Sequence, residues 1–137
     1  MDDYFYPVAS PRFNRGKLPR TPVKLAQSTL LRCEGEPWAP WFQAAGIDAP
    51  EPTRGLVFQD SSMLVRAAAE GHGIALARHT IAEPDIKRGD LVRLFDIEVK
   101  SLDSYYFVCL PSALQKPQVK HFRQWLFEEI AKLDGPA

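Results

Sequence analysis

The sequence predicts an α/β fold in which helices flank a small sheet, and three observations indicate it. Residues 56–78 read as an apolar strand, an amphipathic helix and a second apolar strand with short connections, a pattern typical of parallel pairing. Residues 4–10 and 104–111 are rich in the aromatic and β-branched residues that favour strands. Residues 118–132 carry apolar side chains at helical spacing.

The first strand, YFYPVAS, is predicted to stop at Pro11. Ser10 followed by Pro11 predicts a helix start, with serine as the N-cap and proline at the first helical position. Thr21 followed by Pro22 repeats this device ahead of a second short helix.

Residues 29–35 predict a strand, and a short helix with an aromatic face follows it. Trp38, Trp41 and Phe42 lie three and four residues apart, which places them on one face, and Gly46 supplies the C-terminal stop. We expect the two tryptophans to line the core and a groove.

The next helix begins after Asp60 and should carry an outward pair of opposite charge, Arg66 and Glu70. Gly71 can take the left-handed conformation at its end, and Gly73 permits a sharp turn into the strand IALA. The expected apolar stripe consists of Met63, Leu64, Ala67 and Ala68.

Towards the C-terminus we expect a short helix broken near Pro84, a turn at Gly89 and a strand over residues 91–95. Residues 104–111 predict a second strong strand, and residues 118–132 a long closing helix. The apolar face of that helix should pack on another copy of the chain or back across the same lobe.

The bulk composition excludes several classes of protein. With 17 basic and 17 acidic residues, the chain has no field that would draw it to nucleic acid or to an anionic membrane. It contains no apolar run of about 18 residues and no basic leader, so we expect a cytoplasmic protein without a membrane span. Cys33 and Cys109 are expected to be small buried hydrophobes, with a disulfide or a reactive thiol as the alternative.

Motifs of catalysis and metal binding are missing from the sequence. The histidines His72, His79 and His121 and the cysteines show no C-x-x-C, H-x-x-x-H or H-E-x-x-H spacing. The segment GHGIAL lacks the third glycine of a dinucleotide-binding loop. We therefore expect no catalytic residue, no metal and no cofactor.

Taken in order, five segments of the chain resemble the effector-binding region of LysR-type transcriptional regulators, in the branch of the glycine-cleavage activator and the β-lactamase regulators. The segments are YPVASPRF, PWAPWFQAAGI, VFQDSSMLVRAAAEGHGIALARH, RGDLVRLF and SYYFVCLP with VKHFRQWLFEE. The resemblance implies a periplasmic-binding-protein-like (type II) lobe with a mixed sheet flanked by helices. It also implies that residues 1–107 form lobe two and that residues 108–137 return to an incomplete lobe one.

The resemblance bears directly on Asp60, Ser61 and Ser62. From the residues alone, one of them caps the helix and nothing more is needed. Alternatively, the first-turn N–H groups and the two hydroxyls hold a polar or anionic effector at the positive end of the helix. The resemblance favours the second reading, because the effectors of the family lodge against this helix start.

Tyr105 and Ser10 complete the predicted site. A tyrosine on a strand usually serves packing, whereas the β-lactamase-regulator branch places the residue that matches Tyr105 against the effector cleft. Strand alternation allows only one of Tyr105 and Tyr106 to face the cleft. Ser10 is placed at the other crossover between lobes.

The resemblance implies a regulatory domain that senses a small effector and binds DNA only through a domain absent from this chain. Self-association through the lobe surfaces and the closing helix is expected. A lobe of a solute-binding transport protein is the alternative function, and an enzyme of an α/β class is disfavoured by the missing motifs.

Overall fold

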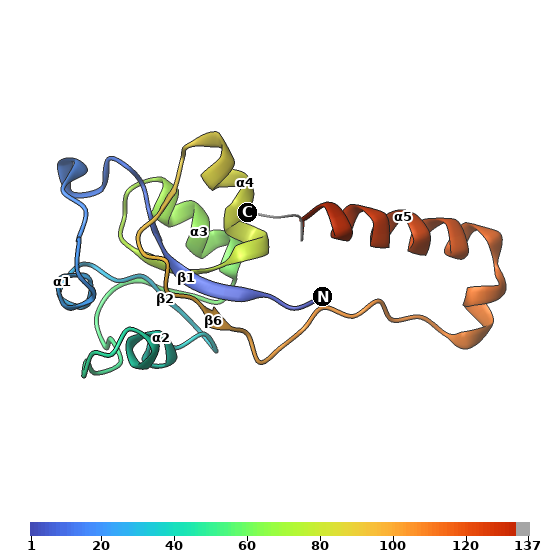
Figure 1. Cartoon of the computed structure of the whole chain (residues 1–137), viewed down its shortest axis with the longest axis horizontal. Helices are drawn as coiled ribbons and strands as arrows, with labels where there is room; N and C mark the ends of the chain where they lie inside the picture. Colours follow the sequence, from blue (N-terminus) through green and yellow to red (C-terminus); the bar gives the residue numbers. More distant parts are fainter. Residues whose placement is uncertain (134–137) are drawn as a thin grey trace. The chain divides into compact units, whose positions relative to one another are not determined.

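The computed structural model describes residues 1–133, which form two compact units (Figure 1). One unit comprises Asp3–Ser101, and the other comprises Met1–Asp2 together with the chain from Leu102 onwards. The strands are β1 (Tyr4–Ala9), β2 (Arg32–Cys33), β3 (Val57–Phe58), β4 (Ala75–Arg78), β5 (Val92–Arg93) and β6 (Val99–Lys100). The helices are η1 (Phe13–Gly16), α1 (Pro22–Ala26), α2 (Ala39–Ala44), α3 (Ser61–Ala69), α4 (His79–Arg88), η2 (Pro111–Gln115) and α5 (Pro117–Leu133).

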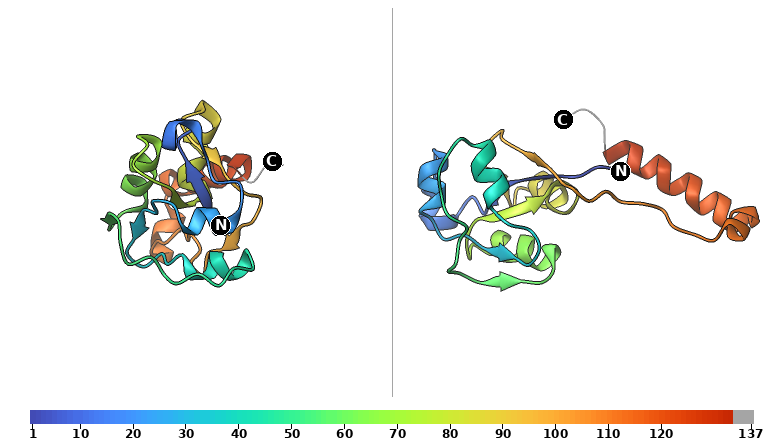
Figure 2. Two further views of the ribbon diagram at one scale, coloured as in Figure 1. Left: turned by 90° about the vertical axis from the view of Figure 1, so that its left-hand side faces the viewer. Right: turned by 90° about the horizontal axis from the view of Figure 1, so that it is seen from below.

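The sheet of the Asp3–Ser101 unit is mixed, as predicted. Strand β1 pairs antiparallel with β4, β5 and β6, and β2 pairs parallel with β3. A parallel bridge between Leu30 and Ile74 joins the two sets, so that β3 and β4 both run parallel to the β2 segment, on either side of it (Figure 2). The two strands of the predicted strand–helix–strand unit, β3 and β4, therefore do not pair with each other directly. Each of them pairs with the β2 segment, which lies between them.

Helices cover both faces of this sheet, and strand alternation explains how. Ala75 and Ala77 pack with residues of α3, whereas Ile74 and Leu76 pack with residues of α1 and α2. All four are buried, which gives each face of the β4 segment its own apolar cluster. The α/β class is confirmed.

The aromatic helix α2 anchors the second cluster. Trp38 stacks on Phe42 at 5.7 Å between ring centroids, and its indole N–H donates to the carbonyl of Leu31 at 3.0 Å. The indole of Trp41 donates to the carbonyl of Ile97 at 3.0 Å. The helix ends at Ala44, and Gly46 just beyond it takes the left-handed conformation, with φ of 71°, as the sequence predicts.

Three local predictions were wrong for identifiable reasons. Met63 is 55% exposed, and Val65 joins Leu64, Ala67 and Ala68 in the buried stripe of α3. Helix α4 runs through Pro84 without a break, since proline costs that turn a single backbone hydrogen bond. Ser10 closes a turn instead of capping a helix, because its carbonyl accepts from the amide of Phe13 at 3.0 Å.

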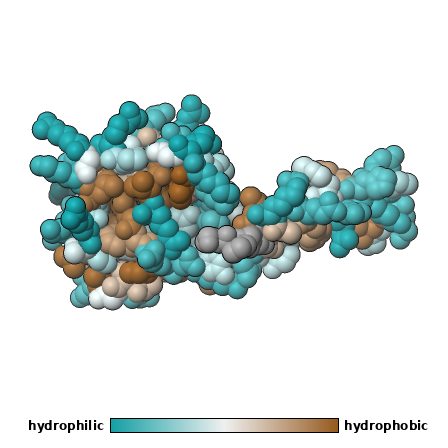
Figure 3. All heavy atoms as spheres, turned by 45° about the horizontal axis from the view of Figure 1, so that its top comes forward, coloured by the Kyte–Doolittle hydropathy of each residue, from teal (hydrophilic) through white to brown (hydrophobic). Residues whose placement is uncertain are grey.

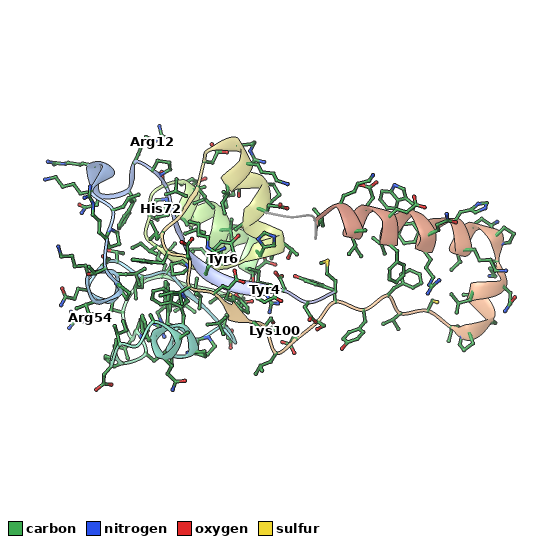
Figure 4. The ribbon with its side chains drawn as sticks, in the orientation of Figure 1. Tyr4, Tyr6, Arg12, Arg54, His72 and Lys100 are labelled. Carbon is green, nitrogen blue, oxygen red and sulfur yellow. The ribbon has the colours of Figure 1, made fainter. Side chains whose placement is uncertain are left out.

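The predicted strand over residues 104–111 is also wrong, because a strand requires a partner. Within the described residues this segment has no strand ladder, and Tyr105 exchanges two backbone hydrogen bonds with Met1. Tyr106, Val108 and Leu110 are each more than two-thirds exposed. Figure 4 shows the end of the true sheet, where Tyr4 of β1 lies opposite Lys100 of β6.

The closing helix α5 is confirmed, but none of its residues is buried. Phe122 contacts Phe107 at 6.2 Å between ring centroids and Trp125 at 5.8 Å, while Trp125 stays 53% exposed. On the face displayed in Figure 3, apolar surface also gathers on the Asp3–Ser101 unit and is bordered by polar side chains. Among residues 1–133, no helix combines the length and the apolar character needed to cross a membrane.

Candidate functional site

Polar side chains gather where three neighbouring strand segments end. Strands β2, β3 and β4 share one direction, so their carboxyl ends meet at the same edge of the sheet. Glu36 follows β2, Ser61 follows β3, and Arg78 is the last residue of β4. Open α/β sheets bind ligands at this edge, which makes the three side chains the candidate site.

Asp60 is the N-cap of α3, as predicted. Its Oδ1 accepts hydrogen bonds from the amides of Ser62 at 2.8 Å and Met63 at 3.1 Å, and also from the hydroxyl of Ser62. The hydroxyl of Ser62 and then these two amides hold the pKa of Asp60 below its ordinary value. The cap is therefore ionised at neutral pH, and it neutralises the positive end of the helix.

Ser61 lies beside the cap and contacts a different carboxylate. Its hydroxyl donates to Oε1 of Glu36 at 2.7 Å, and Nε of Arg78 donates to the same oxygen at 2.7 Å. The side chains of Glu36 and Arg78 are only 8% and 17% exposed, so the ion pair is largely desolvated. A buried pair of this kind fixes geometry, since removing either partner leaves a charge without compensation.

Arg78 has further partners around this ion pair. Its Nη1 donates to the hydroxyl of Ser101 at 3.4 Å, and its guanidinium lies 4.7 Å from the centre of the Phe5 ring. Ser101 in turn donates its backbone amide to the carbonyl of Asp3 at 2.8 Å. The cluster thus reaches the residues at which the chain enters and leaves this unit.

Asp3 is itself buried and caps the next helix. Its carboxylate accepts from the amide of Thr80 at 3.3 Å and from the hydroxyl of Thr80 at 2.6 Å. Helix α4 therefore starts directly against the entry point of the chain. Sequence reasoning missed this capping contact because its two residues are far apart in the chain.

Cys33 lies next to Glu36 and Ser61, but its thiol is poorly suited to act as a nucleophile. Burial, followed by the negative charge of Glu36, raises the pKa of its thiol to about 11. A thiol with such a pKa is protonated at neutral pH and is a weak nucleophile. Both Cys33 and Cys109 are half-buried free thiols.

The structure does not bring Ser10 to this cluster. Phe5 is paired with Arg78, and Ser10 lies five residues further along the strand direction, about 17 Å away at the usual rise per residue. Ser10 is also buried, and its hydroxyl oxygen accepts from the amide of Arg12 at 3.2 Å. It lies at the opposite end of β1 from the boundary between the two units.

Tyr105 belongs to the other compact unit, so its predicted position beside the serines stays a prediction. Its amide donates to the carbonyl of Met1 at 2.8 Å, and its carbonyl accepts from the N-terminal amino group at 2.9 Å. The residue is 42% exposed.

A surface groove elsewhere in the unit contains none of the predicted residues. It runs along residues 23–30 and 46–55, beside α1, and its lining includes Asp48, Glu51 and Arg54. Of the charged residues that line it, Glu51 accepts hydrogen bonds from the amides of Trp38 and Ala39 at the start of α2. Within residues 1–133, no group of three or more histidine, cysteine or carboxylate side chains could hold a metal ion.

Glu36 and Arg78 are the site residues that sequence reasoning missed. Arg78 had a visible signal, because it is a charge at the very end of the buried strand segment IALAR. Glu36 had a weaker one, lying in a turn just before the aromatic helix. The sequence around either residue does not reveal its partner, because Glu36 is 42 positions from Arg78 and 25 positions from Ser61.

Comparisons with known proteins agree on one family. A family model described as the LysR substrate binding domain matches residues 1–131. The glycine cleavage system transcriptional activator of Escherichia coli K12 is 33% identical over 131 residues, covering 94% of this chain and 43% of the relative. The transcriptional activator AmpR of Pseudomonas aeruginosa is 38% identical over 113 residues, covering 81% of this chain and 38% of the relative.

A solved structure gives the same result. The effector domain of the transcriptional regulator AmpR of Pseudomonas aeruginosa superposes with a TM-score of 0.79 at 33% identity. The match covers 96% of this chain and 63% of that domain. The chain thus spans less than half the length of the curated relatives that it matches and about two-thirds of the effector domain.

Proposed function

Because this chain belongs to the LysR substrate-binding domain family, we propose that it binds a small polar effector within a DNA-binding transcriptional regulator. The observation that carries the proposal is the convergence of Glu36, Ser61 and Arg78 at the carboxyl ends of three parallel strand segments. Effector binding favours one arrangement of the regulator, and this shift in population alters its contacts with DNA.

In this proposal residues 1–107 form the second effector-binding lobe, and residues 108–137 return to the first. Ser61 and Ser62 contact the effector, with Tyr105 facing it from the crossover, while Asp60 serves mainly as the cap. The DNA-binding domain lies outside this chain, and the regulator acts in the cytoplasm, where its target DNA is. A role in solute transport is not favoured, because the matched relatives are transcriptional activators. For the same reason we propose that the domain performs no catalysis.

The test begins with a screen of small polar metabolites for compounds that raise the melting temperature of the chain. A compound that binds the native state stabilises it by mass action. Ser61→Ala should abolish the stabilisation, whereas Ser28→Ala, which removes a hydroxyl that donates to the carbonyl of Lys24, should leave it unchanged. In the full-length regulator, Ser61→Ala and Ser62→Ala should weaken the response to the same compound. A wild-type dose–response in both serine variants would contradict the proposal.

A further inference from the structure

The hydroxyl of Ser61 has a fixed direction. Its oxygen lies 2.7 Å from Oε1 of Glu36, and a carboxylate paired with a guanidinium can only accept hydrogen bonds. The hydrogen of Ser61 is therefore donated inward to Glu36. Towards another molecule, the oxygen of Ser61 can therefore only accept a hydrogen bond.

The hydroxyl of Ser62 also donates its hydrogen to a carboxylate of the protein. It donates to Oδ1 of Asp60, and the same oxygen also accepts from the amides of Ser62 and Met63. An incoming anion would need donors, yet both hydroxyl hydrogens and these two amides already serve carboxylates. It would also meet the exposed negative charge of Asp60.

Glu36 adds a second acceptor to this turn. Its side chain is more than nine-tenths buried, and Oε2 is itself buried and has no hydrogen-bond partner among the residues that the structure describes. Arg78 is held by Glu36, by Ser101 and by the ring of Phe5. The turn is therefore rich in acceptor oxygens and negative charge, and its cation is engaged within the protein.

We infer that the part of the effector that meets the α3 turn is a hydrogen-bond donor: a hydroxyl, an amide N–H or an ammonium group. Glu36, held by Arg78, is the positioning residue that sets this preference by turning the hydroxyl of Ser61 inward. The inference rests on the proposed function for the location of the site. It narrows the predicted polar or anionic effector to one that presents a donor here.

Three probes of similar size separate donors from anions: acetate, acetamide and methylammonium. Each is titrated into the ¹⁵N-labelled chain at pH 7 and constant ionic strength, and the amide signals of residues 61–63 are followed. We expect saturable shifts with acetamide and methylammonium, and binding of acetate at least about tenfold weaker. An acetate response at these amides as strong as that of acetamide would overturn the inference while leaving the site in place.

Glu36→Gln tests the positioning role. Glutamine removes the charge and can donate to Ser61, which releases the hydroxyl of Ser61 to donate outward. We expect acetate binding to rise and methylammonium binding to fall, a reversal of preference that a merely structural role would not cause. Glu70→Gln, an exposed carboxylate at the other end of α3, is the matched control and should keep the wild-type preference.

Ser61→Ala provides a second variant if Glu36→Gln does not fold. It removes the acceptor oxygen, so the acetamide response at residues 61–63 should be lost while the spectrum elsewhere is retained. An unchanged response in Ser61→Ala contradicts the inference. Probe-induced shifts confined to other residues, or none at all at residues 61–63, contradict the location of the site and with it the proposed function.

Discussion

Tyr6 and His79 share a hydrogen bond of 2.8 Å between the phenol oxygen and the imidazole Nδ1. Tyr6 is 2% exposed on β1, and His79 is the first residue of α4. The guanidinium of Arg93 lies 4.2 Å from the centre of the tyrosine ring. The bond therefore joins the start of a helix to the centre of the sheet.

Tyr6→Phe removes this bond and should lower the free energy of unfolding at pH 7 by about 0.5–1.5 kcal/mol. Burial raises the pKa of Tyr6 to about 12, although Arg93 acts in the opposite direction. The unfolded chain ionises first, near pH 10. The stability linked to Tyr6 is thus complete below pH 10 and is lost as the pH rises towards 12. Urea denaturation of both proteins at pH 8 and 11 checks this, and an equal difference at the two pH values would contradict it.

Asp60→Ala should lower the urea midpoint at pH 7, because two amides of the first turn of α3 lose their acceptor. Asp60→Asn should retain most of the stability, since asparagine is also a good cap. The pKa of Asp60 is held below its ordinary value of 3.8, so the charged cap stabilises the protein fully above that pH. Its contribution disappears as the pH falls further, and the wild type should then approach Asp60→Ala. A difference that persists undiminished at pH 2 would show that the charge is irrelevant.

The chain alone should not bind operator DNA specifically. Its acidic and basic residues balance at 17 each, and its most basic run, residues 12–24, holds only the short helices η1 and α1. Neither is long enough to act as a recognition helix. Electrophoretic mobility shift at physiological salt checks this, with the full-length regulator as the positive control. A sequence-specific shift by the chain alone would refute the prediction.

Helix α5 should make the chain self-associate. Phe122, Trp125 and Phe127 are each about half exposed on this helix, and apolar surface of this kind favours association. The mass measured by light scattering should therefore rise with concentration. Trp125→Glu should suppress the rise, while Lys120→Glu, an exposed charge change on the same helix, should have a smaller effect. A constant monomeric mass would contradict this prediction.

Features that depend on a few neighbouring residues could be predicted from the sequence. Thr21 caps α1 by accepting from the amide of Lys24, Asp60 caps α3, and Gly71 ends that helix with φ of 86°. Each of these needs only a short window of sequence, because capping chemistry is local. The aromatic face of α2 was equally visible, since helical spacing alone places Trp38, Trp41 and Phe42 together.

The remaining features depend on contacts between distant residues. Residues 104–111 have the composition of a strand, but pairing requires a partner that a local pattern cannot supply. The position of Ser61 was predicted, whereas the direction of its hydroxyl was not, because Glu36 belongs to another strand end. Arg78 likewise gains its role only when β4 lies beside β1 and Phe5 faces it.

Asp3 and Ser101 lie side by side, with the amide of Ser101 donating to the carbonyl of Asp3 at 2.8 Å. The unit between them therefore starts and finishes at one place. A module with this property can be spliced into a surface loop of a host protein through two short linkers, since the gap to be closed is only about 5 Å, the spacing of neighbouring strands. Grafted in this way into a fluorescent protein, the unit would report, as a genetically encoded biosensor, any molecule that binds at the turn of Ser61.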